Sequence, residues 1–295
     1  MKIFLGVALI LLLLEALRSA RVLRINEVEL LFETLPPALE GLRIVHITDL
    51  HSKSFGKRNR RLAHFIRHHH PDLLLATGDM MEPWPNSTRA FCHLLEELNG
   101  KYPVYFSPGN HELRCRDEDR RAETFRRCTD RGMVLLDNAS VTLQRDGTAL
   151  RLYGYAPDEW GGARSHRQAE SFPSKADIDA TLGEKDGAVF SILLAHDPDG
   201  FSGYARWGAD LTLLGHVHGG LWRPFGVGLL SPARRLFPKF CAGVYEAGKF
   251  DARCSAKLFV STGLSGAIIP RLWNPPEIAV LTLRAGQLKK KGQTK

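Results

Sequence analysis

The most informative feature of the sequence is a series of five short motifs rich in metal-binding residue types. In chain order the motifs are Asp49-Leu50-His51, Gly78-Asp79, Gly109-Asn110-His111-Glu112, His196 and Gly215-His216-Val217-His218. Imidazoles mixed with carboxylates suit Mn, Fe or Zn, whereas a set made only of oxygen ligands would indicate Mg or Ca. Two such cations about 3.5–4 Å apart supply a nucleophile at neutral pH and positive charge facing a phosphoryl group. The motifs therefore predict a two-metal hydrolytic site.

Short apolar runs precede the motifs and predict the strands that position them. The runs are residues 43–47, 73–76, 104–106, 192–195 and 211–214. Such runs next to Gly, Pro or Asp are typical of strands in a sheet that is covered on both faces. Ligands of open sheets gather at the carboxyl ends of the strands. We therefore expect the strand ends to bring the motifs together.

The ordered motifs resemble those of the calcineurin-like metallophosphoesterase superfamily, which are Asp-x-His, Gly-Asp, Gly-Asn-His-Glu/Asp, a lone His and Gly-His-x-His. The similarity covers roughly residues 42–278, and the stretch after the last motif resembles the corresponding loop of the membrane-associated bacterial phosphodiesterase branch. It implies an α/β fold, namely a four-layer sandwich of two mixed β-sheets flanked by helices.

The resemblance also implies roles for the motif residues. Two divalent metal ions would be held by Asp49, His51 and His218 on one side, by Asn110, His196 and His216 on the other, and by a bridging Asp79. A hydroxide shared by the ions would attack phosphorus in line. His111 would not be a ligand, but would stabilise the transition state or protonate the leaving oxygen. Glu112 would support the site by orienting an imidazole.

Each motif also has a structural interpretation. An Asp after an apolar run is usually a turn residue or a helix cap, and this applies to Asp49 and Asp79 taken singly. A lone His such as His196 is more often structural, although the following Asp197-Pro198-Asp199 resembles a turn of the superfamily. The ordered set as a whole favours the functional interpretation. Elsewhere, we expect helices over residues 59–70, 87–98 and 116–131, and a hairpin around Asp146-Gly147.

The N-terminus contains a continuous apolar run over residues 3–14, which ends at Glu15. A spanning helix needs about 20 apolar residues, and this run is nearer to the length of a signal-peptide core. A cleaved signal, a retained membrane anchor and an amphipathic surface helix are the alternatives. Arg18 and Arg21 make a poor cleavage site, which favours an anchor with a transmembrane helix in the inner membrane. The basic residues after the run favour a catalytic domain facing the cytoplasm, although the side stays open.

Length and composition indicate one large catalytic domain, since 295 residues with 44% hydrophobic and 24% charged can bury a sizeable core. We divide the chain into an anchor or signal-like segment (1–24), a connector (25–40), the catalytic domain (41–284) and a basic tail (285–295). Of the net charge of +8, five charges lie in the last twelve residues. The domain itself lacks the clustered basic and aromatic residues of a nucleic-acid binder, so no nucleic acid is expected. The tail is either attracted to anionic lipid or simply solvated.

The five cysteines lack C-x-x-C spacing, which argues against a zinc ribbon or a complete disulfide framework and leaves one or two disulfides open. Residues 221–238, directly after the last motif, are apolar, aromatic, basic and interrupted by Gly and Pro. They could form a substrate wall, enter a bilayer interface, or cover the core of the domain.

Together these features predict a hydrolase, a dinuclear metal-dependent phosphoesterase of phosphodiesterase or pyrophosphatase type. Its substrate would be a membrane-associated or amphiphilic phosphoester, by analogy a UDP-2,3-diacylglucosamine-like precursor of lipid A biosynthesis. The alternative is a catalytically inactive phosphoesterase fold that serves as a lipid-binding or scaffold module. The complete ligand set disfavours that alternative. A protein phosphatase is disfavoured because the additional arginine-bearing motifs of that branch are not evident. The native metals and the oligomeric state stay open.

Overall fold

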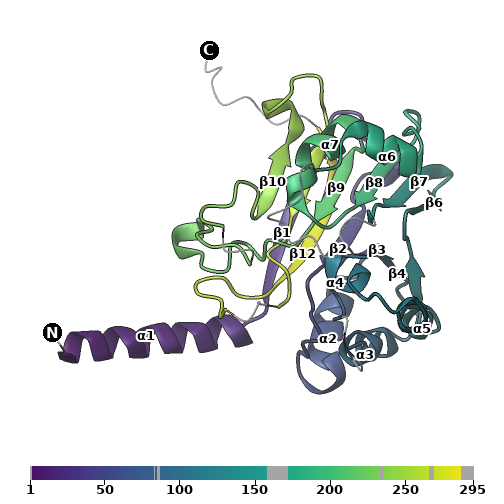
Figure 1. The fold of residues 1–295 in the computed structure, drawn as a ribbon. Coiled ribbons are helices and arrows are strands. Elements are labelled where there is room, and N and C mark those ends of the chain that lie inside the picture. Colours follow the sequence, from purple (N-terminus) through teal and green to yellow (C-terminus); the bar gives the residue numbers. More distant parts are fainter. Residues whose placement is uncertain are drawn as a thin grey trace, which may run out of the picture.

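Two six-stranded sheets pack face to face and carry helices on their outer sides (Figure 1). The computed structural model describes residues 2–82, 84, 87–157, 172–232, 235–265 and 269–286. Both sheets mix parallel and antiparallel pairs, so the predicted four-layer α/β sandwich is confirmed.

The first sheet has the strand order β1-β12-β2-β3-β4-β5. Its strands are β1 (Arg24–Phe32), β12 (Glu277–Ala285), β2 (Arg43–Ile47), β3 (Leu73–Thr77), β4 (Val104–Ser107) and β5 (Met133–Leu135). The second sheet has the order β10-β11-β9-β8-β7-β6. Its strands are β10 (Gly243–Glu246), β11 (Lys257–Val260), β9 (Leu211–Leu214), β8 (Phe190–Leu194), β7 (Thr148–Gly154) and β6 (Ala139–Arg145).

The structure contains seven α-helices in its described ranges, and five of them, α2, α3, α5, α6 and α7, cover the outer faces of the sheets. The seven helices are α1 (Lys2–Arg21), α2 (Arg60–His68), α3 (Arg89–Leu98), α4 (Asn110–Leu113), α5 (Glu118–Thr129), α6 (Lys175–Leu182) and α7 (Phe201–Trp207). Helices α2, α3 and α5 share one buried apolar cluster with the first sheet, and α6 and α7 share another with the second. A third cluster fills the space between the sheets and includes Ile44, Leu75, Ile192, Leu213 and Leu281. Because both faces of the central strands are buried, their sequences are continuous apolar runs.

The strands that precede the motifs run parallel within each sheet. β2, β3 and β4 are parallel neighbours in the first sheet, and β8 and β9 are parallel neighbours in the second. Their carboxyl ends therefore meet at one edge of the sandwich, as the apolar runs predicted. The expected helices are present as α2, α3 and α5 with slightly shorter bounds, and the hairpin around Asp146-Gly147 joins β6 to β7.

The connector that we expected over residues 25–40 contains an edge strand instead. β1 pairs in parallel with β12 over nine residues, from Arg24 to Phe32. Its inner side chains Leu30 and Phe32 are buried among the residues between the two sheets. The short alternation of apolar and charged residues is the pattern of a strand with one covered face.

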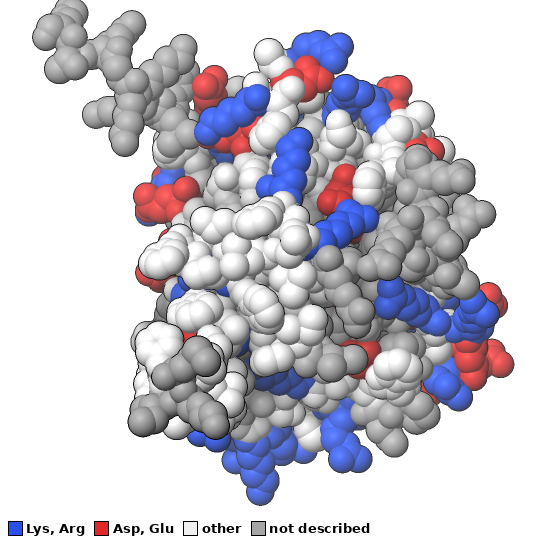
Figure 2. Space-filling model, turned by 60° about the vertical axis from the view of Figure 1, so that its left-hand side comes forward, with Lys and Arg blue, Asp and Glu red and all other residues white. Residues whose placement is uncertain are grey.

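Helix α1 projects from the domain, and the side from which it projects is turned forward in Figure 2. The transmembrane helix predicted from the sequence is not found: none of the helices in the described ranges has the length and apolar character to cross a membrane. The reason is that Glu15, Arg18 and Arg21 occupy the last turns of α1. The apolar stretch 4–14 is about 16 Å long, whereas a hydrocarbon core is about 30 Å thick.

The five cysteines are free thiols. Cys92 on α3 and Cys128 on α5 lie closest, with their sulfur atoms 3.8 Å apart. The disulfides left open by the sequence are thus absent from the structure. The basic tail predicted over residues 285–295 lies outside the described residues from 287 onward.

Candidate active site

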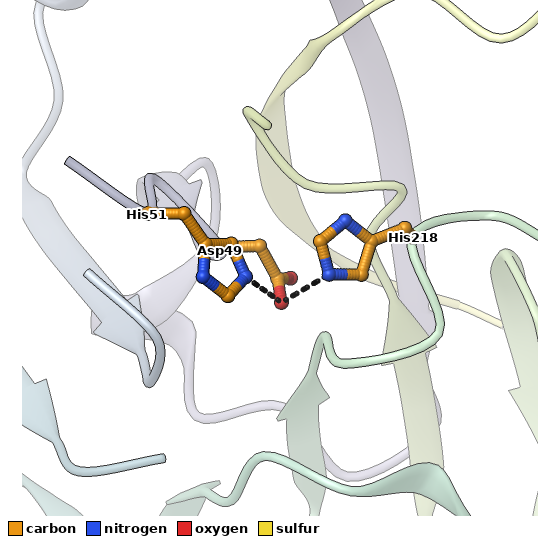
Figure 3. Close-up of side chains that lie close together, drawn as sticks. All are labelled: Asp49, His51 and His218. Atoms are coloured by element: carbon orange, nitrogen blue, oxygen red, sulfur yellow. Dashed lines mark ion pairs between the residues drawn. The ribbon is translucent and has the colours of Figure 1, made fainter. Parts of the chain in front are cut away.

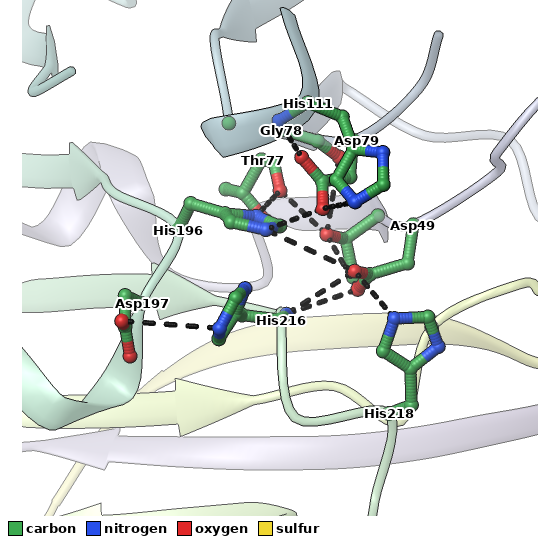
Figure 4. A network of polar contacts seen from close by, with 12 residues as sticks. Asp49, Thr77, Gly78, Asp79, His111, His196, Asp197, His216 and His218 are labelled. Carbon is green, nitrogen blue, oxygen red and sulfur yellow. Dashed lines mark hydrogen bonds and ion pairs between the residues drawn. The ribbon is translucent and has the colours of Figure 1, made fainter. Parts of the chain in front are cut away.

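The motifs converge at the carboxyl ends of five strands, as Figures 3 and 4 show. The loop after β2 contributes Asp49 and His51, the loop after β3 contributes Asp79, and the first turn of α4, which follows β4, contributes Asn110 and His111. His196 follows β8, and the loop after β9 contributes His216 and His218. Residues more than 160 positions apart in the chain thus reach one place, where Asp49, Asp79 and His196 are almost fully buried.

Asp49, His51 and His218 form the first group that could hold a metal ion, with ligating atoms within 4.8 Å of one another. The Nε2 atom of His218 lies 3.3 Å from Oδ1 of Asp49, and the Nε2 atom of His51 lies 3.8 Å from the same oxygen (Figure 3). Both imidazoles therefore point their Nε2 atoms toward one carboxylate. This is the grouping that the family resemblance implied for one ion.

Asp79, His196 and His216 form the second such group. The Oδ2 atom of Asp79 lies 3.1 Å from Nε2 of His196 and 3.7 Å from Nε2 of His51, which belongs to the first group. Figure 4 shows the Asp79 carboxylate beside the imidazole of His196 and close to the Asp49 carboxylate of the first group. This is where a carboxylate shared by two cations would have to lie.

Two of the imidazoles are oriented by backbone carbonyl acceptors on their far sides. Nδ1 of His196 lies 2.8 Å from the carbonyl oxygen of Thr77, and Nδ1 of His218 lies 2.8 Å from that of Ser265. A carbonyl oxygen can only accept, so in both rings Nδ1 carries the proton and Nε2 presents its lone pair to the site. Neutral imidazoles with this tautomer are metal ligands.

The residues present fit two divalent cations by a further criterion. Nε2 of His51 and Oδ1 of Asn110 are buried, and neither has a hydrogen-bond partner among the described residues. A buried acceptor without a partner is costly unless an ion or water satisfies it. Both atoms belong to the predicted ligand set, so a bound cation would account for them.

The loops that carry these residues adopt unusual backbone conformations. Five predicted ligands have positive φ angles: Asp49 (55°), His51 (46°), Asp79 (53°), His216 (67°) and His218 (51°). Non-glycine residues rarely adopt this region, and such strain is concentrated at functional sites. Two glycines permit the close approach of the loops. A Cβ atom on Gly78 would lie 2.5 Å from Nδ1 of His196, and one on Gly215 would lie 2.6 Å from Oδ2 of Asp49.

Comparison with known proteins agrees with this geometry. A family model described as calcineurin-like phosphoesterase matches residues 42–220, more than half of the chain. The chain belongs to this family. The uncharacterized metallophosphoesterase YkuE of Bacillus subtilis is 26% identical to this phosphoesterase over 259 residues, which cover 85% of this chain and 82% of YkuE.

Two further relatives are longer than this chain. The uncharacterized metallophosphoesterase Cj0846 of Campylobacter jejuni is 28% identical over 273 residues, covering 89% of this chain and 64% of the relative. A transmembrane protein with metallophosphoesterase domain from Danio rerio is 25% identical over 269 residues, covering 88% of this chain and 57% of the relative. The phosphoesterase thus spans less than two thirds of either relative. The family match shows that it is a metal-dependent phosphoesterase.

Glu82, which no sequence motif indicated, links the predicted ligand His51 to the predicted catalyst His111. Its Oε1 atom lies 2.9 Å from Nδ1 of His51, and its Oε2 atom lies 2.7 Å from Nδ1 of His111. Burial would raise the pKa of Glu82, but His111 and His51 outweigh it and lower the pKa to about 2. Glu82 is therefore a carboxylate that orients a predicted ligand and the predicted catalyst at once. Its position three residues after Asp79 was the available signal.

Glu112 holds the backbone of the site and does not orient an imidazole, which corrects the role implied by the resemblance. Its Oε2 atom accepts hydrogen bonds from the N–H groups of Asp79 and Gly109, both at 2.9 Å, and Oε1 accepts from Met81 at 3.0 Å. Burial and the nearby Asp79 carboxylate raise the pKa of Glu112. The side chain joins the loops after β3 and β4, and so fixes the position of Asp79.

His111 differs from the predicted ligands in being accessible. A quarter of its side chain is exposed, and its Nε2 atom lies 3.8 Å from Oδ2 of Asp79. Burial alone would lower its pKa, but the Asp79 and Glu82 carboxylates outweigh burial and raise it. A protonated, partly exposed imidazole beside the site can donate a proton to a leaving oxygen.

Arg271 is a second residue of the site that no sequence motif indicated. It is buried, and its Nη2 atom donates to the carbonyl oxygens of Thr262, at 2.5 Å, and of Ser265. Ser265 is also the acceptor for His218, so the guanidinium supports that imidazole from behind. No motif or periodicity in the sequence indicates this contact, because it depends on how the segment before β12 folds back.

Proposed function

We propose that this phosphoesterase hydrolyses a phosphodiester or pyrophosphate bond with two divalent cations, drawn from Mn, Fe or Zn. The observation that carries the proposal is the Asp79 carboxylate, whose Oδ2 atom lies within 3.7 Å of an imidazole from each candidate metal group. The seven proposed ligands are those implied by the motifs: Asp49, His51, Asp79, Asn110, His196, His216 and His218. Mixed nitrogen and oxygen ligands of this kind suit borderline metals.

The chemistry is divided between the cations and the chain. When bound, two such cations provide a water activated for attack on phosphorus and neutralise charge on the phosphoryl oxygens. His111 donates a proton to the leaving oxygen on the accessible side of the site. Glu82 holds His111 through Nδ1, so that Nε2 is the nitrogen that faces the substrate. Glu112 and Arg271 keep the loops of Asp79 and His218 in place before substrate arrives.

The substrate class that we propose is an amphiphilic phosphoester at a membrane, with the phosphoesterase associated through its N-terminus. The exposed apolar stretch of α1 supports this assignment. A relative named as a transmembrane protein with metallophosphoesterase domain also supports it. By analogy, UDP-2,3-diacylglucosamine of lipid A biosynthesis represents the substrate chemistry. The asymmetry of basic residues around α1 favours a site that faces the cytoplasm.

The experiment measures metal-dependent hydrolysis of bis-p-nitrophenyl phosphate and of UDP-2,3-diacylglucosamine by the purified protein with Mn. Asp79→Asn removes the shared carboxylate, and we expect a loss of activity of at least about 100-fold. Asp146→Asn is the matched control, because Asp146 is an exposed turn residue with φ of 48° that Asn tolerates equally well. Full activity in Asp79→Asn would contradict the mechanism. Diester hydrolysis without hydrolysis of the lipid substrate would contradict the lipid assignment alone.

A further inference from the structure

Three segments that are far apart in the sequence lie together beside the active site. The backbone N–H of Trp273 donates to Oε1 of Glu15 in α1, at 2.8 Å. Trp222, in the loop after β9, forms a β-bridge with Leu272 and donates its indole N–H to the carbonyl oxygen of Pro270, at 3.1 Å. Hydrogen bonds thus join α1 and the loop segment around Trp222 to residues 269–275.

These segments expose large apolar side chains on one side of the molecule. We call this set the apolar face: Phe4, Leu5, Val7, Leu9, Ile10, Leu11, Leu12, Leu13, Leu14, Leu17, Trp222, Phe225, Val227, Leu236, Phe237 and Trp273. Phe225 is fully exposed, and Phe237 is exposed by 67%. Figure 2 shows uncharged side chains gathered on this side, and Figure 1 shows α1 projecting beyond the loop after β9.

The composition of α1 identifies the environment that would cover it. Its consecutive residues Leu9 to Leu14 are all exposed, so every side of the helix is apolar. A groove on a partner protein or a second helix would cover only one side of α1, whereas lipid surrounds a helix completely. The apolar stretch 4–14 is about 16 Å long, close to the roughly 15 Å hydrocarbon depth of one leaflet.

The base of α1 has the chemistry of a lipid headgroup zone. Arg18 and Arg21 are exposed in its last turns. Nζ of Lys53 donates to the carbonyl oxygen of Ala20, at 3.1 Å, and Nη1 of Arg61 donates to that of Arg21, at 3.2 Å. Four basic side chains therefore surround the end of the helix, where they would meet anionic headgroups. The exposed Trp222 is an aromatic of the kind enriched at this depth.

We propose that the apolar face inserts into one leaflet of an anionic phospholipid bilayer. Residues 4–14 of α1 enter the hydrocarbon, and the loop aromatics lie at the level of the headgroups. The loop after β9 also carries His216 and His218, and Arg271, two residues before Trp273, donates to the carbonyl oxygen of Ser265 that His218 contacts. Insertion would therefore place the metal-binding loops at the lipid surface. In this respect the inference rests on the proposed function, because a substrate with a lipid portion would lie in the same surface.

The test measures flotation of the full chain with vesicles of phosphatidylcholine and phosphatidylglycerol. Leu9→Asp tests the helix, and the double variant Phe225→Ser with Phe237→Ser tests the loop. We expect each to weaken partition roughly tenfold or more, because each removes large apolar side chains from the hydrocarbon or interface. Phe172→Ser is the matched control: Phe172 is exposed by 42%, and it precedes α6 on the opposite side of the domain. Its partition should equal that of the wild type.

Depth is measured by quenching of tryptophan fluorescence with brominated phospholipids. Trp222 and Trp273 should be quenched more by bromine near the headgroups than by bromine near the chain ends, and replacing both with Phe should remove most of the effect. Trp207 is buried in the domain and should not contribute. Quenching that is unchanged in the double replacement would overturn the placement of the loop, since any contribution of the exposed Trp84 is common to both proteins.

Several results would overturn the proposal. Wild-type partition by the loop double variant would show that the loop does not insert. A lipid-free dimer that dissociates in the loop double variant, together with no binding to vesicles, would show that the face is covered by a second copy. Hydrolysis of bis-p-nitrophenyl phosphate by the wild type without vesicles reports the proposed function separately. Vesicle binding without hydrolysis would refute the proposed function but support insertion of the apolar face. Hydrolysis without vesicle binding would support the proposed function but refute insertion.

Discussion

Replacing Glu82 with Gln tests whether His111 acts as a proton donor in this phosphoesterase. The substitution keeps the size of the side chain but removes the charge that accepts from Nδ1 of His111, at 2.7 Å, and from Nδ1 of His51. A hydrogen bond to a charged acceptor contributes about 1.5–3 kcal/mol. If it holds His111 in the transition state, its loss lowers kcat about 10- to 150-fold.

The loss should depend on the leaving group. A p-nitrophenolate leaves readily without a proton, whereas the departure of the more basic phenolate depends more strongly on protonation by an acid. We therefore expect Glu82→Gln to reduce hydrolysis of phenyl esters more than hydrolysis of p-nitrophenyl esters. Glu123→Gln, an exposed Glu on α5, is the matched control and should hydrolyse both as the wild type does. The metal content of Glu82→Gln is measured as well, because loss of the contact with the predicted ligand His51 would lower it and loss of the contact with His111 would not.

The pH profile provides a second measurement. Asp79 and Glu82 raise the pKa of His111 against the opposing effect of burial. If protonated His111 is the active form, activity falls as the pH rises through this pKa. Removing the Glu82 charge lowers the pKa, so the basic limb should move to lower pH. A loss of equal size for both leaving groups, with an unmoved basic limb and full metal content, would refute the role of His111 as acid.

Two further predictions concern residues behind the site. Burial lowers the pKa of His46 from 6.5 to about 3, so its contribution to stability is full above pH 6.5 and is lost as pH falls toward 3. Between pH 7.5 and 4.5 the wild type should therefore lose about 3 kcal/mol more in urea unfolding than His46→Gln, and equal losses would show that His46 is not the titrating group. Glu112→Gln should destabilise the protein by about 2–5 kcal/mol, because an amide cannot accept from all three N–H groups that now donate to the carboxylate. Unchanged unfolding together with unchanged metal content would contradict the role of Glu112 in fixing the loops.

The sequence predicted those strands in which burial on both faces requires a continuous run of apolar residues. β2, β3, β8 and β9 are buried on both faces, and their apolar runs identified them. β1 was taken for a connector because only one of its faces is covered and because it pairs with β12, about 250 residues away. Pairing between strands so far apart in the chain leaves no recognisable pattern in the local sequence.

The residues of the candidate site likewise fall into those that sequence motifs predicted and those that only the structure revealed. The predicted metal-binding groups could be found because their residue types recur in a fixed order along the chain. Glu82 and Arg271 could not be found in this way, since their contacts arise only when loops from different strands meet. The role of Glu112 was misjudged for a related reason. A carboxylate next to an imidazole in sequence does not reveal that it accepts from three backbone N–H groups instead.

Two buried charges of opposite sign explain how the strained loops keep their shape. Asp79 and His218 both have positive φ angles, which cost free energy unless the surroundings fix them. Glu112 accepts hydrogen bonds from the backbone N–H of Asp79 and of neighbouring residues. Arg271 donates to the carbonyl oxygen of Ser265, which also accepts from His218. A buried charge is itself tolerated only when hydrogen bonds satisfy it. Each charged side chain, Glu112 or Arg271, and the loop that it binds therefore stabilise one another. The positions of Asp79 and His218 are therefore set by the chain itself, which reduces the reorganisation needed when metal or substrate binds.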